Sequence, residues 1–165
     1  MIEEKQFLEL FRNIPPEFAV MIMSMLPITE LRAAIPFGIT AYKMDIFSAF
    51  FWGVLGNIIP PIFFIFFLEK IAQILSDRFA FWKRFFNWLF ERTRKKAHAK
   101  IEKYGSWGLY LLVAIPLPMT GGWTGALAAF LFGIERKKSI PIIVLGIITA
   151  GIIIVLITTG IVRLF

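Results

Sequence analysis

The stretch EFAVMIMSMLPITELRAAIPFGITAY, residues 17–42, is apolar enough for a membrane but is broken in its middle. Two prolines, Pro27 and Pro36, and two charged residues, Glu30 and Arg32, interrupt it, so one continuous span is not expected. Two half-helices, over about 17–26 and 29–42, fit better. Each is too short to cross a hydrocarbon core of ~30 Å at ~1.5 Å per residue, which predicts a re-entrant hairpin.

A second apolar stretch, 106–134, is broken in the same way by the run PLPMTGG at 116–122. The segments LPITELRAAIPFGI (26–39) and LPMTGGWTGALAAFLFGI (117–134) both open with Leu-Pro-x-Thr and both end in Phe-Gly-Ile. Paired broken segments in the two halves of a chain indicate an internal repeat around a binding site. We therefore predict a second re-entrant hairpin over 106–134.

An unbroken apolar segment follows each hairpin, and we predict full transmembrane helices over 46–68 and 139–162. Residues 69–103, between the halves, hold ten Lys and Arg against four acidic residues, with aromatic residues spaced mostly at three and four. This pattern predicts an amphipathic helix in the membrane interface, with its basic side chains toward anionic lipid headgroups.

The predicted fold is all-α and integral to the membrane, a single domain over 1–165 with repeats at 1–68 and 104–165. Lys and Arg collect on the cytoplasmic side of membranes, which places the connector 69–103 and the cluster Arg136-Lys137-Lys138 there. Both termini would then be outside and the hairpins would enter from opposite sides, so the repeats are inverted. We expect a multi-pass protein of the cell membrane.

Composition agrees with a membrane protein and excludes several other classes. The chain has 165 residues, of which 58% are hydrophobic, against roughly 45–50% in soluble domains. There is no cysteine, and the one histidine, His98, lies in a basic run. No catalytic or cofactor motif is present, so we expect no enzyme, no catalytic residue, no metal ligand and no cofactor. The basic residues lie between spans, and nucleic acid is not an expected partner.

Glu30 and Arg32 are the charges deepest within an apolar stretch, where an ionisable group is costly and usually functional. Residues two apart on a helix point in different directions, so we predict that they do not pair with each other. Glu30 is a candidate proton or cation carrier, and Arg32 is a candidate anion clamp. The alternative is a static salt bridge across the hairpin interface, or snorkelling to the membrane surface.

Thr29 and Thr120 each follow a break and precede a helical arm, so we predict that both are N-caps. The two helix N-termini together with Arg32 would form a pocket for an anion such as a phosphate headgroup. The alternative is that each threonine only caps its own helix.

Other candidate binding residues lie near the second break and in the first span. Gly121 and Gly122 permit close approach of a ligand, and Trp123 is placed to stack over it, with apolar packing as the alternative. Asn57 is a candidate to hydrogen-bond the opposing hairpin.

The segments ELRAAIPFGI (30–39) and IPLPMTGGWTGALAAFLFGI (115–134) resemble the small multidrug export protein family. The run Thr120-Gly121-Gly122-Trp123-Thr124-Gly125 carries much of the match and adds Thr124 to the candidate site. That family looks like a distant branch of the DedA superfamily. The resemblance implies inverted repeats with re-entrant hairpins, and activities such as proton-dependent transport, undecaprenyl phosphate translocation and lipid scrambling.

The chain departs from the DedA pattern in its second hairpin. DedA proteins typically carry arginines there, in a pattern like Arg-Phe-x-Pro followed by another Arg, whereas VAIPLPM at 113–119 contains none. Polyprenyl-phosphate activity is therefore not carried over, and Arg32 is the single arginine candidate.

Three functions follow as hypotheses. The first is a small transporter or lipid translocase that moves an anionic lipid headgroup, held by Arg32 and coupled to protons through Glu30. The second is an exporter of small hydrophobic or cationic compounds with Glu30 as the main ligand. The third is a protein that organises the membrane without transport. Because so small a chain offers little protein to cover two hairpins, we also expect a homodimer.

Overall fold

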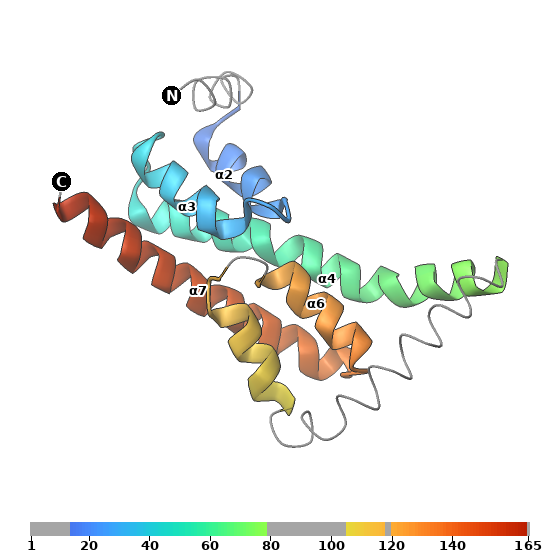
Figure 1. Cartoon of the computed structure of the whole chain (residues 1–165). Coiled ribbons are helices and arrows are strands. Elements are labelled where there is room, and N and C mark those ends of the chain that lie inside the picture. Colours follow the sequence, from blue (N-terminus) through green and yellow to red (C-terminus); the bar gives the residue numbers. More distant parts are fainter. Residues whose placement is uncertain (1–13, 79–104, 118–119, 165) are drawn as a thin grey trace. The chain divides into compact units, whose positions relative to one another are not determined.

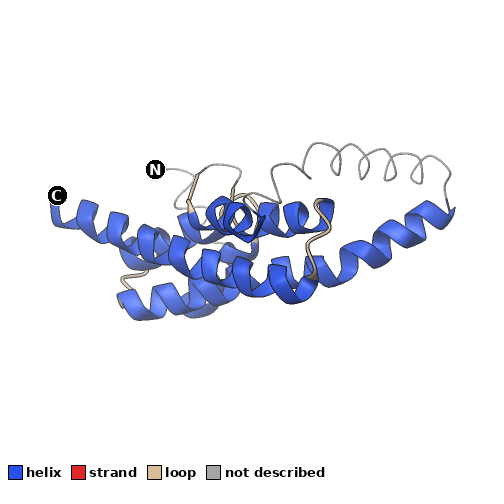
Figure 2. Ribbon diagram, turned by 90° about the horizontal axis from the view of Figure 1, so that it is seen from below, coloured by secondary structure: helices blue, strands red, loops and turns tan. Residues whose placement is uncertain are grey.

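The computed structural model describes residues 14–78, 105–117 and 120–164. Every element in this part of the chain is a helix, with no strand (Figure 2). Two of the helices are long and apolar enough to cross a membrane, which agrees with the predicted all-α membrane fold. Most of the predicted basic connector, 79–103, lies outside the described residues.

The first broken stretch forms two short helices, α2 (Pro16–Met25) and α3 (Glu30–Thr40), which lie side by side (Figure 1). Between them, Leu26 is extended, as expected for a residue that precedes a proline. The helices have 10 and 11 residues, or about 15 Å each, half of a hydrocarbon core. The predicted break is confirmed. That the pair re-enters the membrane stays a prediction.

Helix α4 (Ile46–Arg78) follows the first hairpin, and its segment Ile46–Phe67 is the first candidate span. Asp45 caps its start, because one carboxylate oxygen accepts hydrogen bonds from the backbone N–H groups of Phe47 (2.9 Å) and Ser48 (3.2 Å). The helix runs beyond the predicted end at 68, since no proline or glycine follows until after Arg78.

The second broken stretch also forms two short helical pieces, Gly105–Ala114 and α6 (Gly122–Leu131). Helix α7 (Arg136–Leu164) follows, and its segment Arg136–Gly160 is the second candidate span. Each half of the chain therefore repeats the order short helix, break, short helix, long helix.

The chain divides into two compact units. The first comprises Met1–Asn57 with Gly151–Phe165, and the second is Ile58–Ala150. Helices α4 and α7 each contribute a segment to both units. The sequence did not indicate this division, because the predicted repeats end between helices and the units end within them.

In the first unit, α2 and α3 pack against small residues on α4. A Cβ atom added at Gly56 would clash with the backbone carbonyl of Met21, and one at Gly53 would lie 2.6 Å from Ile35. Ser24 of α2 is fully buried and donates a hydrogen bond of 2.6 Å to the carbonyl of Gly53. The backbone of α2 thus lies directly on α4, as is usual where small residues line membrane helices.

The second unit uses glycines in the same way. Added Cβ atoms at Gly125 of α6 and Gly146 of α7 would both clash with Val113, which is 1% exposed. Tyr110 and Thr149 share a hydrogen bond of 2.9 Å between their hydroxyl groups. The helical piece Gly105–Ala114 therefore packs closely against α6 and α7, where Gly125 and Gly146 leave room for Val113.

These contacts predict that Gly56→Ala destabilises the protein by about 1–3 kcal/mol, because the new methyl group meets backbone that cannot move aside. Gly160→Ala is the matched control, since nothing lies within 4 Å of its Cβ position and alanine favours a helix. Thermal unfolding of the purified protein in detergent measures both. Equal midpoints for the two variants would contradict the close packing of α2 on α4.

Candidate functional site

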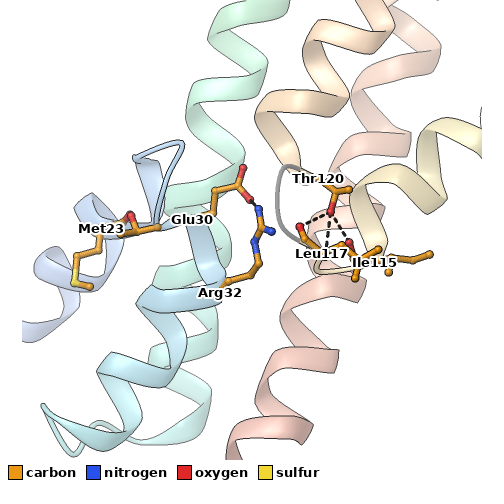
Figure 3. Close-up of polar contacts among 7 residues, drawn as sticks. Met23, Glu30, Arg32, Ile115, Leu117 and Thr120 are labelled. Atoms are coloured by element: carbon orange, nitrogen blue, oxygen red, sulfur yellow. Dashed lines mark hydrogen bonds and ion pairs between the residues drawn. The ribbon is translucent and has the colours of Figure 1, made fainter.

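Glu30 and Arg32 form an ion pair at the first break, with 2.8 Å between a guanidinium nitrogen and a carboxylate oxygen (Figure 3). The prediction that they do not pair was wrong. It assumed that both residues have regular helical geometry, but Glu30, the first residue of α3, has a φ of 45°. This left-handed conformation turns its side chain out of the helical register and toward Arg32.

The pair is unequally exposed. The side chain of Glu30 is 3% exposed and that of Arg32 is 22% exposed. A carboxylate so deeply buried is tolerated as a charge only because a cation accompanies it. Glu30 also holds a backbone conformation that costs a non-glycine residue about 1–3 kcal/mol, and such strain collects at functional sites. These two features make the pair the strongest candidate site in the described chain.

Thr29 and Thr120 were predicted to be N-caps, which is confirmed for the position of Thr29 and wrong for Thr120. Thr29 occupies the N-cap position of α3 but makes no side-chain cap hydrogen bond, and the N-cap of α6 is Gly121. Instead, the Thr29 hydroxyl donates to the carbonyl of Met23, near the end of α2. The helical donor for that carbonyl would come from position 27, which is a proline and has no N–H.

Thr120 has the corresponding role in the second hairpin. Its hydroxyl lies within donating distance of the carbonyls of Ile115 (2.7 Å) and Leu117 (2.8 Å), and it accepts from the N–H of Leu117 (3.1 Å) (Figure 3). These carbonyls also accept backbone N–H groups, from Leu26 for Met23, from Leu117 for Ile115 and from Thr120 for Leu117. Both threonine hydroxyls therefore add a side-chain hydrogen bond that ties the break to the end of the preceding arm.

We expect Thr29→Val and Thr120→Val each to destabilise the protein by about 0.5–1.5 kcal/mol, because each removes a side-chain hydrogen bond that ties the break to the preceding arm. Thr40→Val is the control. Its hydroxyl is exposed and bonds the carbonyl of Pro36, one turn back on the same helix, so the change should stay within about 0.5 kcal/mol. Denaturant unfolding in detergent measures all three, and three equal results would contradict this role.

The remaining predicted residues of the second break have different surroundings. Gly121 has a φ of 125° and a ψ of −164°, a conformation open almost only to glycine, and Gly122 is buried. Trp123 packs against Phe64 of α4 with 5.5 Å between ring centroids, which is the apolar packing named as its alternative. Thr124 is half-buried.

Asn57 is 2% exposed, and its side-chain oxygen and nitrogen have no hydrogen-bond partner within the described residues. The predicted hydrogen bond from Asn57 to a hairpin is therefore not found in that part of the chain. Thr29, Glu30 and Arg32 lie together at the first break, and Thr120 to Thr124 lie together at the second. That the two sets form one pocket stays a prediction.

A second polar feature was not predicted as a site. A cavity of about 210 Å³ at the start of α7 is lined by polar side chains, Glu135, Arg136 and Ser139, and by apolar residues including Ile65 and Phe130. The Arg136 guanidinium lies over the ring of Phe66, 5.4 Å from its centroid. The sequence marked Arg136 only as an orientation signal. Ser139, which is fully buried, gave no signal at all.

Metal binding was not expected. Within the described residues, no group of three or more His, Cys, Asp or Glu side chains could hold a metal ion. This finding does not test the expectations that the protein needs no cofactor and is not an enzyme, and both stay predictions.

The comparisons with known proteins identify a family. Residues 30–153 match the family described as "Putative small multi-drug export protein", a match that begins at Glu30 and includes α3, α4, the second break and most of α7. No curated protein and no solved structure matches the chain. The relation to the DedA superfamily stays a prediction. Because the match covers most of its length, the chain belongs to this family of small multidrug export proteins.

Proposed function

We propose that the protein exports small hydrophobic or cationic compounds across the membrane, and that the Glu30–Arg32 pair is the polar site that the transported compound reaches. The observation that carries the proposal is the ion pair itself, a 2.8 Å contact around a carboxylate that is 3% exposed. The pair lies where an apolar hairpin is broken, and the family description supports export.

The pair can exchange partners. A proton on Glu30 removes the charge that attracts Arg32, and a cationic compound can replace Arg32 at the carboxylate. Because both groups are largely removed from water, each exchange changes the electrostatic energy far more than it would at the surface. The proton and the cationic compound therefore compete for one carboxylate, so that binding of one releases the other, which is the requirement for proton-coupled export.

The second candidate is translocation of an anionic, phosphate-bearing lipid headgroup. One observation favours it: Arg32 is the more exposed partner of the pair, so an anion could bind the guanidinium while Glu30 is protonated. In this case the compound competes with Glu30 and not with Arg32.

Liposomes that contain the purified full chain distinguish the candidates. Under an imposed pH gradient, export predicts transport of the cationic dye ethidium that stops when the gradient is dissipated. Lipid translocation predicts that dithionite bleaches fluorescent phosphatidylglycerol in the inner leaflet. Empty liposomes are the control. If only the lipid signal appears, the export proposal is wrong. If neither appears, a role in membrane organisation without transport gains support.

A further inference from the structure

The buried amide of Asn57 is a polar feature that the packing of the protein does not explain. The residue is 2% exposed, and neither Oδ1 nor Nδ2 has a partner among the described residues. Most buried polar side chains have at least one hydrogen bond, because losing water without a replacement is costly. An amide of this kind is expected where a ligand or water supplies the missing partner.

Asn57 lies near the middle of the candidate span Ile46–Phe67, where the backbone is also short of donors. Pro60 and Pro61 lie within α4 and have no N–H groups, so the carbonyls of Gly56 and Asn57 lose the helical donors four residues on. The Asn57 amide and the carbonyls of Gly56 and Asn57 thus lie within one turn of an otherwise apolar helix, and this turn is called the level of Asn57.

The first hairpin packs next to this level. Ser24 of α2 donates to the carbonyl of Gly53, which lies one turn before Asn57 and on the same face of α4. The carbonyl of Met21 rests on Gly56, which adjoins Asn57. The first hairpin therefore lies against α4 within one turn of Asn57, and small residues allow this close contact.

We propose that Asn57 binds a neutral hydrogen-bonding group that offers both a donor and an acceptor, either water or a hydroxyl or amide of the transported compound. This inference rests on the proposed export function and extends its site from the ion pair of the first hairpin to the middle of the first span. The Oδ1 atom accepts from the ligand, and the Nδ2 amide donates to it.

Reaction with a small water-borne reagent tests whether this level is reached from water. The chain has no cysteine, so N57C provides a single thiol for 2-aminoethyl methanethiosulfonate in liposomes. A49C is the matched control, because Ala49 is fully buried two turns earlier on α4. We expect the N57C thiol to react at least about tenfold faster than the A49C thiol. Equal rates would overturn the proposal.

Asn57→Leu distinguishes a binding amide from a structural one. Leucine has a similar size and no polar atoms, so removing an amide that the protein itself leaves unpaired should keep or raise the melting temperature. Export of ethidium should fall if the amide contacts the compound, whereas unchanged export with fast N57C labelling would assign the site to water. A lowered melting temperature would overturn the proposal, because it would show that the folded protein satisfies the amide.

This design separates the inference from the function on which it rests. If the wild-type chain exports nothing, the export proposal fails. N57C labelling still shows whether water reaches position 57, and the N57L melting temperature still shows whether the folded protein leaves the Asn57 amide unpaired.

Discussion

Arg32→Leu is expected to destabilise the protein by about 3–5 kcal/mol, the usual result of removing one partner of a buried ion pair. The variant leaves the Glu30 carboxylate, which is 3% exposed, without the cation that lies 2.8 Å from it. Denaturant unfolding in detergent measures the effect.

Two controls make this result specific. Lys138→Leu removes the partner of Glu135 from an ion pair whose side chains are 66% and 70% exposed, and it should cost no more than about 1 kcal/mol. The double variant Glu30→Leu/Arg32→Leu removes both charges and should recover most of the stability lost in Arg32→Leu. A cost for Arg32→Leu no larger than that for Lys138→Leu would contradict the buried pair.

Glu30→Gln is expected to lower ethidium export by at least about tenfold, because glutamine keeps the shape of the side chain but can neither carry the charge nor bind the exchanged proton. The residual transport should also lose its dependence on the pH gradient. Initial rates in liposomes under a series of imposed gradients measure both properties.

Glu135→Gln is the matched control, because it makes the same chemical change at a carboxylate that is 70% exposed. Its export rate should equal that of the wild type. Full, gradient-dependent export by Glu30→Gln would contradict the proposed role of Glu30, whatever compound is transported.

The breaks in the two hairpins could be predicted from the sequence because local chemistry determines them. Pro27 removes an N–H and makes Leu26 extended, and the arms on both sides are apolar but short. The second break has the same Leu-Pro-x-Thr signal. The two long apolar helices were predictable for a similar reason, since hydrophobic length is a property of the sequence alone.

The partners of the polar groups could not be predicted in the same way. The rule for residues two apart applies within a regular helix, and it failed at Glu30 because this residue has a left-handed conformation. The threonines were assigned to the helices that they precede, yet their hydroxyls bond carbonyls of the preceding arms. A threonine hydroxyl in a turn can bond the helix before it or the helix after it. The geometry of the turn decides between them, and this geometry cannot be derived from the residue identities.

Packing contacts were the least predictable. The contact between Met21 and Gly56 joins residues far apart in the chain, and neither segment contains a sequence pattern that predicts which residue it contacts. The same holds for Ser139, whose place in a cavity follows from the fold around α7. For Asn57, the sequence indicated a polar residue in a span, but only the structure shows that it is buried without a partner in the described chain.

Cysteine labelling from one side of the membrane tests the central claim, that the two broken stretches are hairpins that enter from opposite sides. The cysteine-free chain allows single cysteines at both ends of each hairpin, at Glu17 and Lys43 for the first and at Ser106 and Lys137 for the second. With a membrane-impermeant maleimide on oriented vesicles, we predict that E17C and K43C react from the outside, and that S106C and K137C react from the inside. Reaction of E17C and K43C from opposite sides would show that residues 17–42 cross the membrane, and it would contradict the account.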